Sequence, residues 1–102
     1  MVEVLRGTVV EEEIELTLVE LCQASGSERE QVVRWVVEGV LEVSGEAPDD
    51  WRFPGTALRR ARLAASFTRE LEVNEPGVAL ALDLLDEIEA LRSQLQRLRH
   101  WR

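Results

Sequence analysis

The stretch that most constrains the fold is residues 17–39, TLVELCQASGSEREQVVRWVVEG. Thr17 and Glu20 have the spacing of a capping box, in which each side chain bonds the other's backbone amide at a helix start. Ser27 and Glu30 repeat that spacing, and Ser25-Gly26 between them predicts the left-handed turn that ends a helix. Two short helices, about 18–24 and 28–38, joined by a glycine turn form a helix-turn-helix.

The second of these helices is expected to be amphipathic. Its inner face carries the valines Val32, Val33, Val36 and Val37, followed by Val40. Its outer side carries the candidate partner-binding residues Glu28, Glu30, Gln31, Arg34, Trp35 and Glu38. Two interpretations of Trp35 stay open: an exposed anchor with a charged rim, or a core residue packed under the next segment against Phe53, as large aromatics in small domains usually are.

The charge of this helix is unusual for a helix-turn-helix. Residues 1–50 contain 3 arginines and 13 acidic residues, whereas residues 51–102 contain 9 arginines and 7 acidic residues. Acids in a first helical turn complement the helix dipole, which explains Glu28 and Glu30 locally. The excess of acidic residues over arginines in residues 1–50 opposes binding to phosphate backbones and favours a basic partner.

Residues 40–55 predict a β wing. A strand at Val40–Val43, a polar turn from Gly45 to Asp50 and a returning strand at 51–53 would place Trp51 and Phe53 on one face, against the helices. Thr56 is expected to cap a third helix, about 57–72. Its small-residue inner stripe is Leu58, Ala61, Ala64, Ala65 and Leu71. Its outward arginines, which fit a solvated face better than a phosphate-binding stripe, are Arg59, Arg60, Arg62 and Arg69.

A fourth helix is predicted from Asn74 as its cap and Pro76 in its first turn. The segment GVALALDLL is apolar almost all round, so we expect its first half to be buried. Further along, five residues at 4-3-4-3 spacing form a heptad seam: Leu84, Ile88, Leu91, Leu95 and Leu98. Burial of such side chains contributes roughly 1.5–3 kcal/mol each before ordering costs. The seam therefore predicts self-association as a homodimer.

Several classes of function are not expected from the remaining residues. Cys22 is the only cysteine, which excludes an intramolecular disulfide and fits a buried core position. Residues 1–16 predict a short strand or a small hairpin around Arg6-Gly7, and Glu11 to Glu13 a solvated connector. We find no signal peptide, no membrane span, no phosphate loop, no metal-ligand spacing and no base beside a nucleophile. We expect a cytoplasmic protein that is not an enzyme and holds no cofactor or metal.

A glycine turn, an aromatic residue and a closing Glu-Gly-x-Leu occur at Gly26, Trp35, Glu38-Gly39 and Leu41. With the order helix-turn-helix, wing, helix and long helix, they resemble the DNA-binding half of MerR-type regulators. Glu30 and Val33 depart from that pattern, because MerR proteins have arginines there that contact DNA. DNA binding is therefore not expected.

A closer resemblance runs along almost the full chain. The residues that carry it are Glu20-Leu21-Cys22, Ser27-Glu28 with Glu30, Gly39-Val40-Leu41-Glu42, Trp51-Arg52-Phe53 and the block RELEVNEPGVALALDLLDEIEAL at 69–91. They resemble the chaperone-modulator family CbpM. The resemblance implies binding to the J-domain of CbpA, a DnaJ-like co-chaperone, in competition with the chaperone DnaK. It also implies inhibition of the co-chaperone and DNA-binding activities of CbpA.

The predicted fold is all-α: a MerR-like winged helix-turn-helix with a short β wing and a long C-terminal helix. The chain is expected to be one domain, 1–102. Within it, 1–16 is an N-terminal strand or extension, 17–74 is the winged helix-turn-helix with the third helix, and 75–102 is the dimerisation helix. The alternative functions are a dimeric MerR-type transcription regulator and a dimerisation module with another basic partner.

Overall fold

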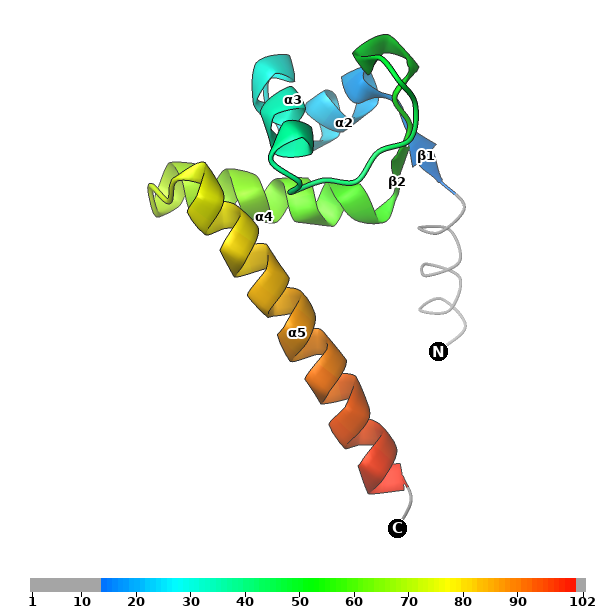
Figure 1. The fold of residues 1–102 in the computed structure, drawn as a ribbon, viewed down its shortest axis with the longest axis vertical. Helices are drawn as coiled ribbons and strands as arrows, with labels where there is room; N and C mark the ends of the chain where they lie inside the picture. Colours follow the sequence, from blue (N-terminus) through cyan, green and yellow to red (C-terminus); the bar gives the residue numbers. More distant parts are fainter. Residues whose placement is uncertain (1–13, 101–102) are drawn as a thin grey trace.

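A computed structural model describes residues 14–100, and the all-α prediction with a small β component is confirmed (Figure 1). The elements, in chain order, are β1 (Glu15–Leu16), α2 (Leu18–Ser25), α3 (Arg29–Val37), the 3₁₀ turn η1 (Pro48–Asp50), β2 (Phe53–Pro54), α4 (Thr56–Glu70) and α5 (Glu75–His100). The predicted hairpin around Arg6-Gly7 and the segment Glu11–Glu13 lie outside the described residues.

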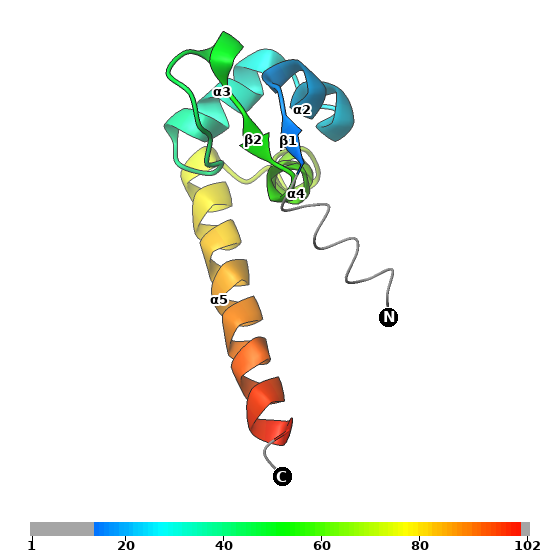
Figure 2. The ribbon, with the colours of Figure 1, turned by 90° about the vertical axis from the view of Figure 1, so that its right-hand side faces the viewer.

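The helices divide the molecule into a compact head and a projecting helix. Figure 1 shows α2 and α3 on one side of α4, while α5 starts at the far end of α4 and extends away from them. In Figure 2, β1 and β2 lie side by side next to α4. The principal dimensions are 49 × 29 × 24 Å. Most of α5 therefore stands clear of the core that holds the head together.

The start and end of α2 are as predicted. The Thr17 backbone N–H donates to Glu20 Oε1 at 2.8 Å, and the Glu20 backbone N–H donates to Thr17 Oγ1 at 3.1 Å. Gly26 adopts the left-handed conformation at φ 69° and donates its N–H to the carbonyl of Cys22. A side chain at this φ would be strained, so glycine is the residue that best ends the helix there.

The predicted second capping box is wrong. Helix α3 begins at Arg29, with Glu28 rather than Ser27 at the N-cap, and no side chain accepts a capping hydrogen bond. The local sequence matches the capping-box spacing, but the turn after Gly26 ends one residue later than that spacing requires. The side chains of Glu28 and Glu30 are left exposed at the helix start.

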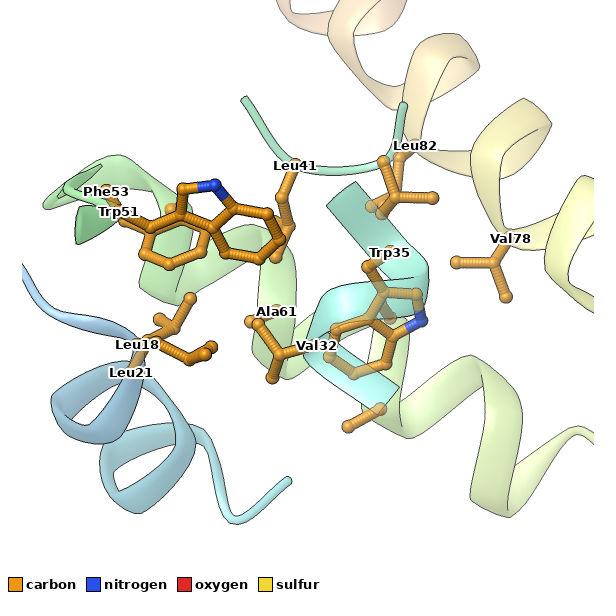
Figure 3. Packing of buried hydrophobic residues seen from close by; sticks show 14 residues of the cluster. Leu18, Leu21, Val32, Trp35, Leu41, Trp51, Phe53, Ala61, Val78 and Leu82 are labelled. Carbon is orange, nitrogen blue, oxygen red and sulfur yellow. The ribbon is translucent and has the colours of Figure 1, made fainter. Parts of the chain in front are cut away.

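The core lies between α2, α3, α4, the β2 region and the first turns of α5. The predicted outer position of Trp35 is wrong, because its side chain is 0% exposed. Figure 3 shows its indole between Val32 and the α5 residues Val78 and Leu82. Val37, predicted to face inward, is instead 76% exposed. The core interpretation of Trp35 is thus correct, although its labelled neighbours in Figure 3 include α5 residues as well as the helix-turn-helix.

The β wing exists in a shorter form than predicted. Residues 40–43 are not a strand; a single antiparallel bridge joins Ser44 and Arg52 instead. The returning strand β2 pairs with β1, with Leu16 opposite Phe53. Trp51 and Phe53 are both buried, as predicted, with ring centroids 6.0 Å apart in an edge-to-face arrangement. The N-terminal segment thus takes the pairing position that the sequence pattern assigned to Val40–Val43.

Helix α4 packs through small residues. Its buried side chains are Ala57, Ala61, Ala64 and Ala65. Methyl side chains allow neighbouring helices to approach closely, and α4 packs against both α2 and α5. The helix begins at Thr56 with Gly55 as its N-cap, so Thr56 is not the cap that the sequence predicted. Leu71, placed in the stripe by its spacing, is exposed beyond the end of the helix.

Helix α5 begins as predicted, because Asn74 Oδ1 accepts from the Gly77 N–H at 2.9 Å. The expected burial of its whole first half is wrong. Val78 and Leu82 are buried against the head, while Leu80, Leu84 and Leu85 are exposed. Leu80 and Leu84 lie on the side of the helix turned away from the head, whereas Leu85 borders the groove between α4 and α5.

Candidate functional site

The exposed side of α3 is the first candidate surface. Glu28, Glu30 and Glu38 are exposed, and none of their carboxylates forms a hydrogen bond or ion pair with another residue in the range 14–100. A DNA-recognition helix carries donors and positive charge on this side, which contact phosphates and base edges. Here the same side presents unpaired carboxylates. Its chemistry suits a donor-rich, cationic partner.

Two further predicted site residues are tied to the start of α5. Gln31 Nε2 donates to Glu75 Oε1 at 2.9 Å, and Arg34 Nη1 lies 3.5 Å from the same oxygen. Arg34 is mostly exposed, whereas Gln31 is half-buried. These contacts neutralise Arg34 locally and leave the acidic side chains to dominate the surface.

Trp35, the sixth predicted site residue, does not belong to this surface. Its full burial means that a partner on α3 meets the side chains around it and not the indole itself. The structure therefore brings Glu28, Glu30, Gln31, Arg34 and Glu38 to one accessible region and removes Trp35 from it. Trp35 lies in the core beneath this surface.

The second candidate surface is the apolar seam on α5. Its predicted members, Leu84, Ile88, Leu91, Leu95 and Leu98, are between 43% and 66% exposed. At 100° per residue they lie within about 40° of one line, on the side of the helix opposite Val78 and Leu82. Leu80 lies on the same line and is also exposed. The sequence analysis did not include Leu80 in the seam, because Leu80 comes before the first residue of the 4-3-4-3 pattern. Its position four residues before Leu84 could have indicated that it belongs there.

A groove of about 810 Å³ lies between α4 and α5 beside the seam. Its apolar lining includes Leu63, Leu85 and Ile88. Arg60 crosses it: its Nε donates to the Val40 carbonyl at 2.9 Å and its Nη1 to Asp86 Oδ2 at 2.7 Å. This arginine joins the end of the helix-turn-helix to α5, and therefore helps to set the direction in which the seam projects.

Two other arginines of α4 have roles that the sequence did not reveal. Arg62 donates to the Ala24 carbonyl at 3.2 Å, and Arg69 to the Gly26 carbonyl at 2.8 Å. Both carbonyls belong to the end of α2 and its turn, where helical acceptors lack partners. These arginines therefore help to hold the turn that positions α3.

Two titratable groups near the turn are perturbed. The backbone and side-chain hydrogen bonds from Thr17 lower the pKa of Glu20. Burial raises the pKa of the half-buried Cys22 thiol, with a smaller opposing effect from Arg29. Both shifts have structural causes at a helix start and a core edge, and neither group lies beside a base or a nucleophile that would use it.

Between residues 14 and 100, no three His, Cys, Asp or Glu side chains are grouped so that they could hold a metal ion. No described helix combines the length and apolar character needed to cross a bilayer.

Comparison with known proteins agrees with this geometry. The family model for MerR HTH family regulatory proteins matches residues 16–100. The chain is 42% identical over 96 residues to the chaperone modulatory protein CbpM of Coxiella burnetii (strain Dugway 5J108-111), which covers 94% of this chain and 91% of that protein. It is 41% identical over 86 residues to CbpM of Pseudomonas putida (strain GB-1), covering 84% of this chain and 85% of that protein. The chain belongs to the CbpM family of chaperone modulatory proteins, within the wider MerR helix-turn-helix family.

Proposed function

We propose that this protein is a non-enzymatic modulator that binds the J-domain of a CbpA-type, DnaJ-like co-chaperone. By occupying the J-domain it competes with DnaK and inhibits both the co-chaperone and the DNA-binding activities of its target. The site of action is the cytoplasm, where such a co-chaperone works. The proposal extends to this chain the role that the names of its relatives state in general terms, chaperone modulation.

The observation that carries the proposal is the acidic side of α3. Glu28, Glu30 and Glu38 are exposed and unpaired among residues 14–100, where a DNA-binding relative needs positive charge. A J-domain that recruits DnaK through a basic helix offers the complementary charge. Charge complementarity mainly accelerates association and selects the partner. The same carboxylates repel a phosphate backbone, so one surface supports both the proposed partner and the expectation that the protein does not bind DNA.

We further propose that the functional unit is a homodimer of single-domain chains joined through residues 75–102. The five leucine-class side chains of the seam are exposed in the single chain, and burying them against a second copy removes a large apolar surface from water. The head and the seam lie on different parts of the molecule, so dimerisation leaves the acidic side of α3 free. Each dimer therefore presents two acidic surfaces.

The test is a charge reversal, Glu28→Arg with Glu30→Arg, measured by calorimetry against an isolated J-domain of a DnaJ-like co-chaperone. We expect J-domain affinity to fall about tenfold or more, because two attractive contacts become repulsive. Affinity for duplex DNA should rise in a gel-shift assay. Unchanged J-domain affinity would mean that the acidic side of α3 is not the docking surface.

The matched control is Glu87→Arg with Glu89→Arg on α5. This pair has the same spacing and the same change in net charge but lies away from α3. We expect it to leave J-domain affinity within about twofold of the starting protein. A sedimentation measurement on the control confirms that its oligomeric state is unaltered.

The second candidate function is a dimeric MerR-type transcription regulator, favoured by the family match over residues 16–100. It predicts saturable binding of the unaltered protein to duplex DNA at physiological salt and no binding to any J-domain. The two functions therefore give opposite results with the same two ligands.

A further inference from the structure

Helix α3 presents two valines on the side opposite its buried face. Val37 is 76% exposed, more than any other large apolar side chain in the described range 14–100. Val33 precedes it by about one turn and is half-buried. At 100° per residue the two valines lie about 40° apart around the helix axis, and Val37 lies about 160° from the buried Trp35. We call Val33 and Val37 the valine strip.

The fold itself does not account for a valine at position 37. A β-branched residue has a lower helix propensity than a straight-chain residue, and a mostly exposed side chain gains little from burial in its own chain. A single exposed apolar residue is ordinary in folded proteins. Val37, however, adjoins Val33, whose side chain is also incompletely covered. An apolar centre inside a charged rim is the usual arrangement of a protein interface.

The rim of the valine strip is acidic. Glu30 lies two turns before Val37 and within about 20° of the same line along the helix. Glu38 follows Val37 directly at the end of α3. Both carboxylates are exposed. A partner that covers the strip therefore meets negative charge at both ends of it.

The two arginines of α3 do not cancel this charge, because each is already paired with an acid of another element. Arg29 Nη2 lies 3.5 Å from Asp49 Oδ1 in η1. Arg34 Nη1 lies 3.5 Å from Glu75 Oε1 at the start of α5. The charge left for a partner around the strip is consequently negative, and it favours lysine or arginine side chains beside whatever covers the valines.

We propose that the valine strip is the apolar anchor of the docking surface on α3, and that it receives an apolar side chain flanked by lysines or arginines on one helix of the partner. This inference rests on the proposed function, because it assigns the short-range contact within the same surface. The acids select a cationic partner and speed its association. Burial of Val33 and Val37 against the partner's apolar side chain then slows dissociation.

The variant Val37→Thr tests the anchor in the full-length protein, because it keeps the shape of the side chain and replaces one methyl group with a hydroxyl. We expect the J-domain dissociation rate in stopped-flow measurements to rise about five- to tenfold, while the association rate stays within about twofold. The melting temperature should not change, since Val37 is exposed. Val19→Thr, the same change at an exposed valine of α2, should alter neither rate. An unchanged dissociation rate for Val37→Thr overturns the inference.

A second test needs no J-domain. Methyl resonances of the full-length protein are followed by nuclear magnetic resonance during titration with a synthetic helical peptide that carries leucines on one face and lysines on the others. We expect the methyl groups of Val33 and Val37 to shift saturably while those of Val19 stay in place. Unmoved Val37 methyl resonances overturn the strip.

Two further peptides test the chemistry of the partner. Replacing the lysines with glutamates, or the leucines with glutamines, should weaken the response of the Val37 methyl groups strongly. An equal response to the glutamate peptide overturns the requirement for basic flanks, and an equal response to the glutamine peptide overturns the apolar contact. Sedimentation of Val37→Thr should give the mass of the starting protein. A lower mass means that a second copy covers the strip, and also overturns the inference.

The two proposals fail in different ways. If the J-domain does not bind but the leucine–lysine peptide shifts the Val37 methyl resonances, the proposed function is wrong and the valine strip stands. If the J-domain binds, but Val37→Thr releases it at an unchanged rate and the Val37 methyl resonances do not move, the function stands and the anchor is wrong.

Discussion

Trp35 and Val37 are two residues apart on α3. The core position is the correct one of the two interpretations of Trp35, and the predicted inward position of Val37 is wrong. The valine run makes a broad apolar face at helical spacing, so Trp35 fell on the polar side between Arg34 and the acids. In the structure the indole fills the space between α3 and the start of α5, and Val37 is left outside. Residue volume decided the outcome, because a tryptophan side chain buries far more apolar area than a valine.

This placement predicts very different costs for two truncations. Trp35→Ala should destabilise the protein by about 3–5 kcal/mol, the usual effect of removing a buried aromatic side chain. Val37→Ala on the same helix should change the free energy of unfolding by less than about 0.5 kcal/mol. Urea denaturation measures both. Similar values for the two variants would contradict the observed packing of α3.

The capping box at Thr17 gives a prediction on pH dependence. Hydrogen bonds from Thr17 lower the folded-state pKa of Glu20, so the ionised form stabilises the fold above the ordinary pKa near 4.5. That stabilisation disappears as the pH falls through the lower folded-state value. Glu20→Gln should therefore be less stable than the starting protein at pH 7, with a difference that narrows by pH 3. Glu87→Gln, an exposed acid on α5, serves as the control in urea titrations at both pH values. A gap that stays constant with pH would show that the charge of Glu20 has no part in capping.

At the scale of elements, the sequence predicted a helix start or end correctly where a single short-range hydrogen-bonding pattern defines it. The Thr17–Glu20 box, the left-handed Gly26 and the Asn74 cap are each complete within four residues, and the structure has all three. The Ser27–Glu30 box failed although its spacing is the same. The packing of α3 against the core sets the residue at which this helix starts. Residues 27–30 alone carry no information about that packing.

The wing shows the same limit for strands. The sequence predicted a strand at Val40–Val43, but the segment that pairs with β2 is determined only by the tertiary structure. In the fold β1 occupies the edge of β2, and the segment after α3 is held instead by Arg60 at the Val40 carbonyl. Gly45 completes the wing turn at φ 109°, where an added Cβ would lie 2.6 Å from the Asp50 carbonyl oxygen. A side chain at this position would therefore have to displace the backbone.

The seam on α5 gives the prediction at this scale. Ile88→Asp with Leu91→Asp should convert a dimer to a monomer, because two buried carboxylates in an apolar interface are strongly unfavourable. Analytical ultracentrifugation measures the change in mass. Ser93→Asp with Gln96→Asp places the same charges on another face of α5 and should leave the mass unchanged. A dimer that survives the first pair would exclude the seam as its interface.

For the whole molecule, the distribution of charge along the chain says more about possible partners than the net charge does. The net charge is −8, and the first half of the chain holds the excess of acid. The acidic side of α3 belongs to that half and stands on the head, while the apolar seam projects on α5 (Figure 1). The acidic surface and the apolar surface are thus kept apart on one small chain.

This arrangement predicts how J-domain binding depends on salt. The association rate should fall by about tenfold between 50 and 300 mM salt, because screening removes long-range attraction. The dissociation rate should change much less, since it depends on short-range contacts. Stopped-flow kinetics measures both rates, on the starting protein and on Glu28→Arg with Glu30→Arg. An association rate that is flat with salt would contradict electrostatic steering by α3.

The order of the helices, the helix-turn-helix, the exposure of the α3 acids and of the α5 seam, and the family could all be predicted from the sequence, because spacing, caps and charge are properties of neighbouring residues. Three features depended on the tertiary structure: the burial of Trp35, the pairing of β2 with β1, and the single contact face of α5. Each is a competition between segments distant in the chain for the same space in the core. Side-chain volume and the segments available for packing or pairing decide such a competition. Neither can be deduced from a short stretch of sequence.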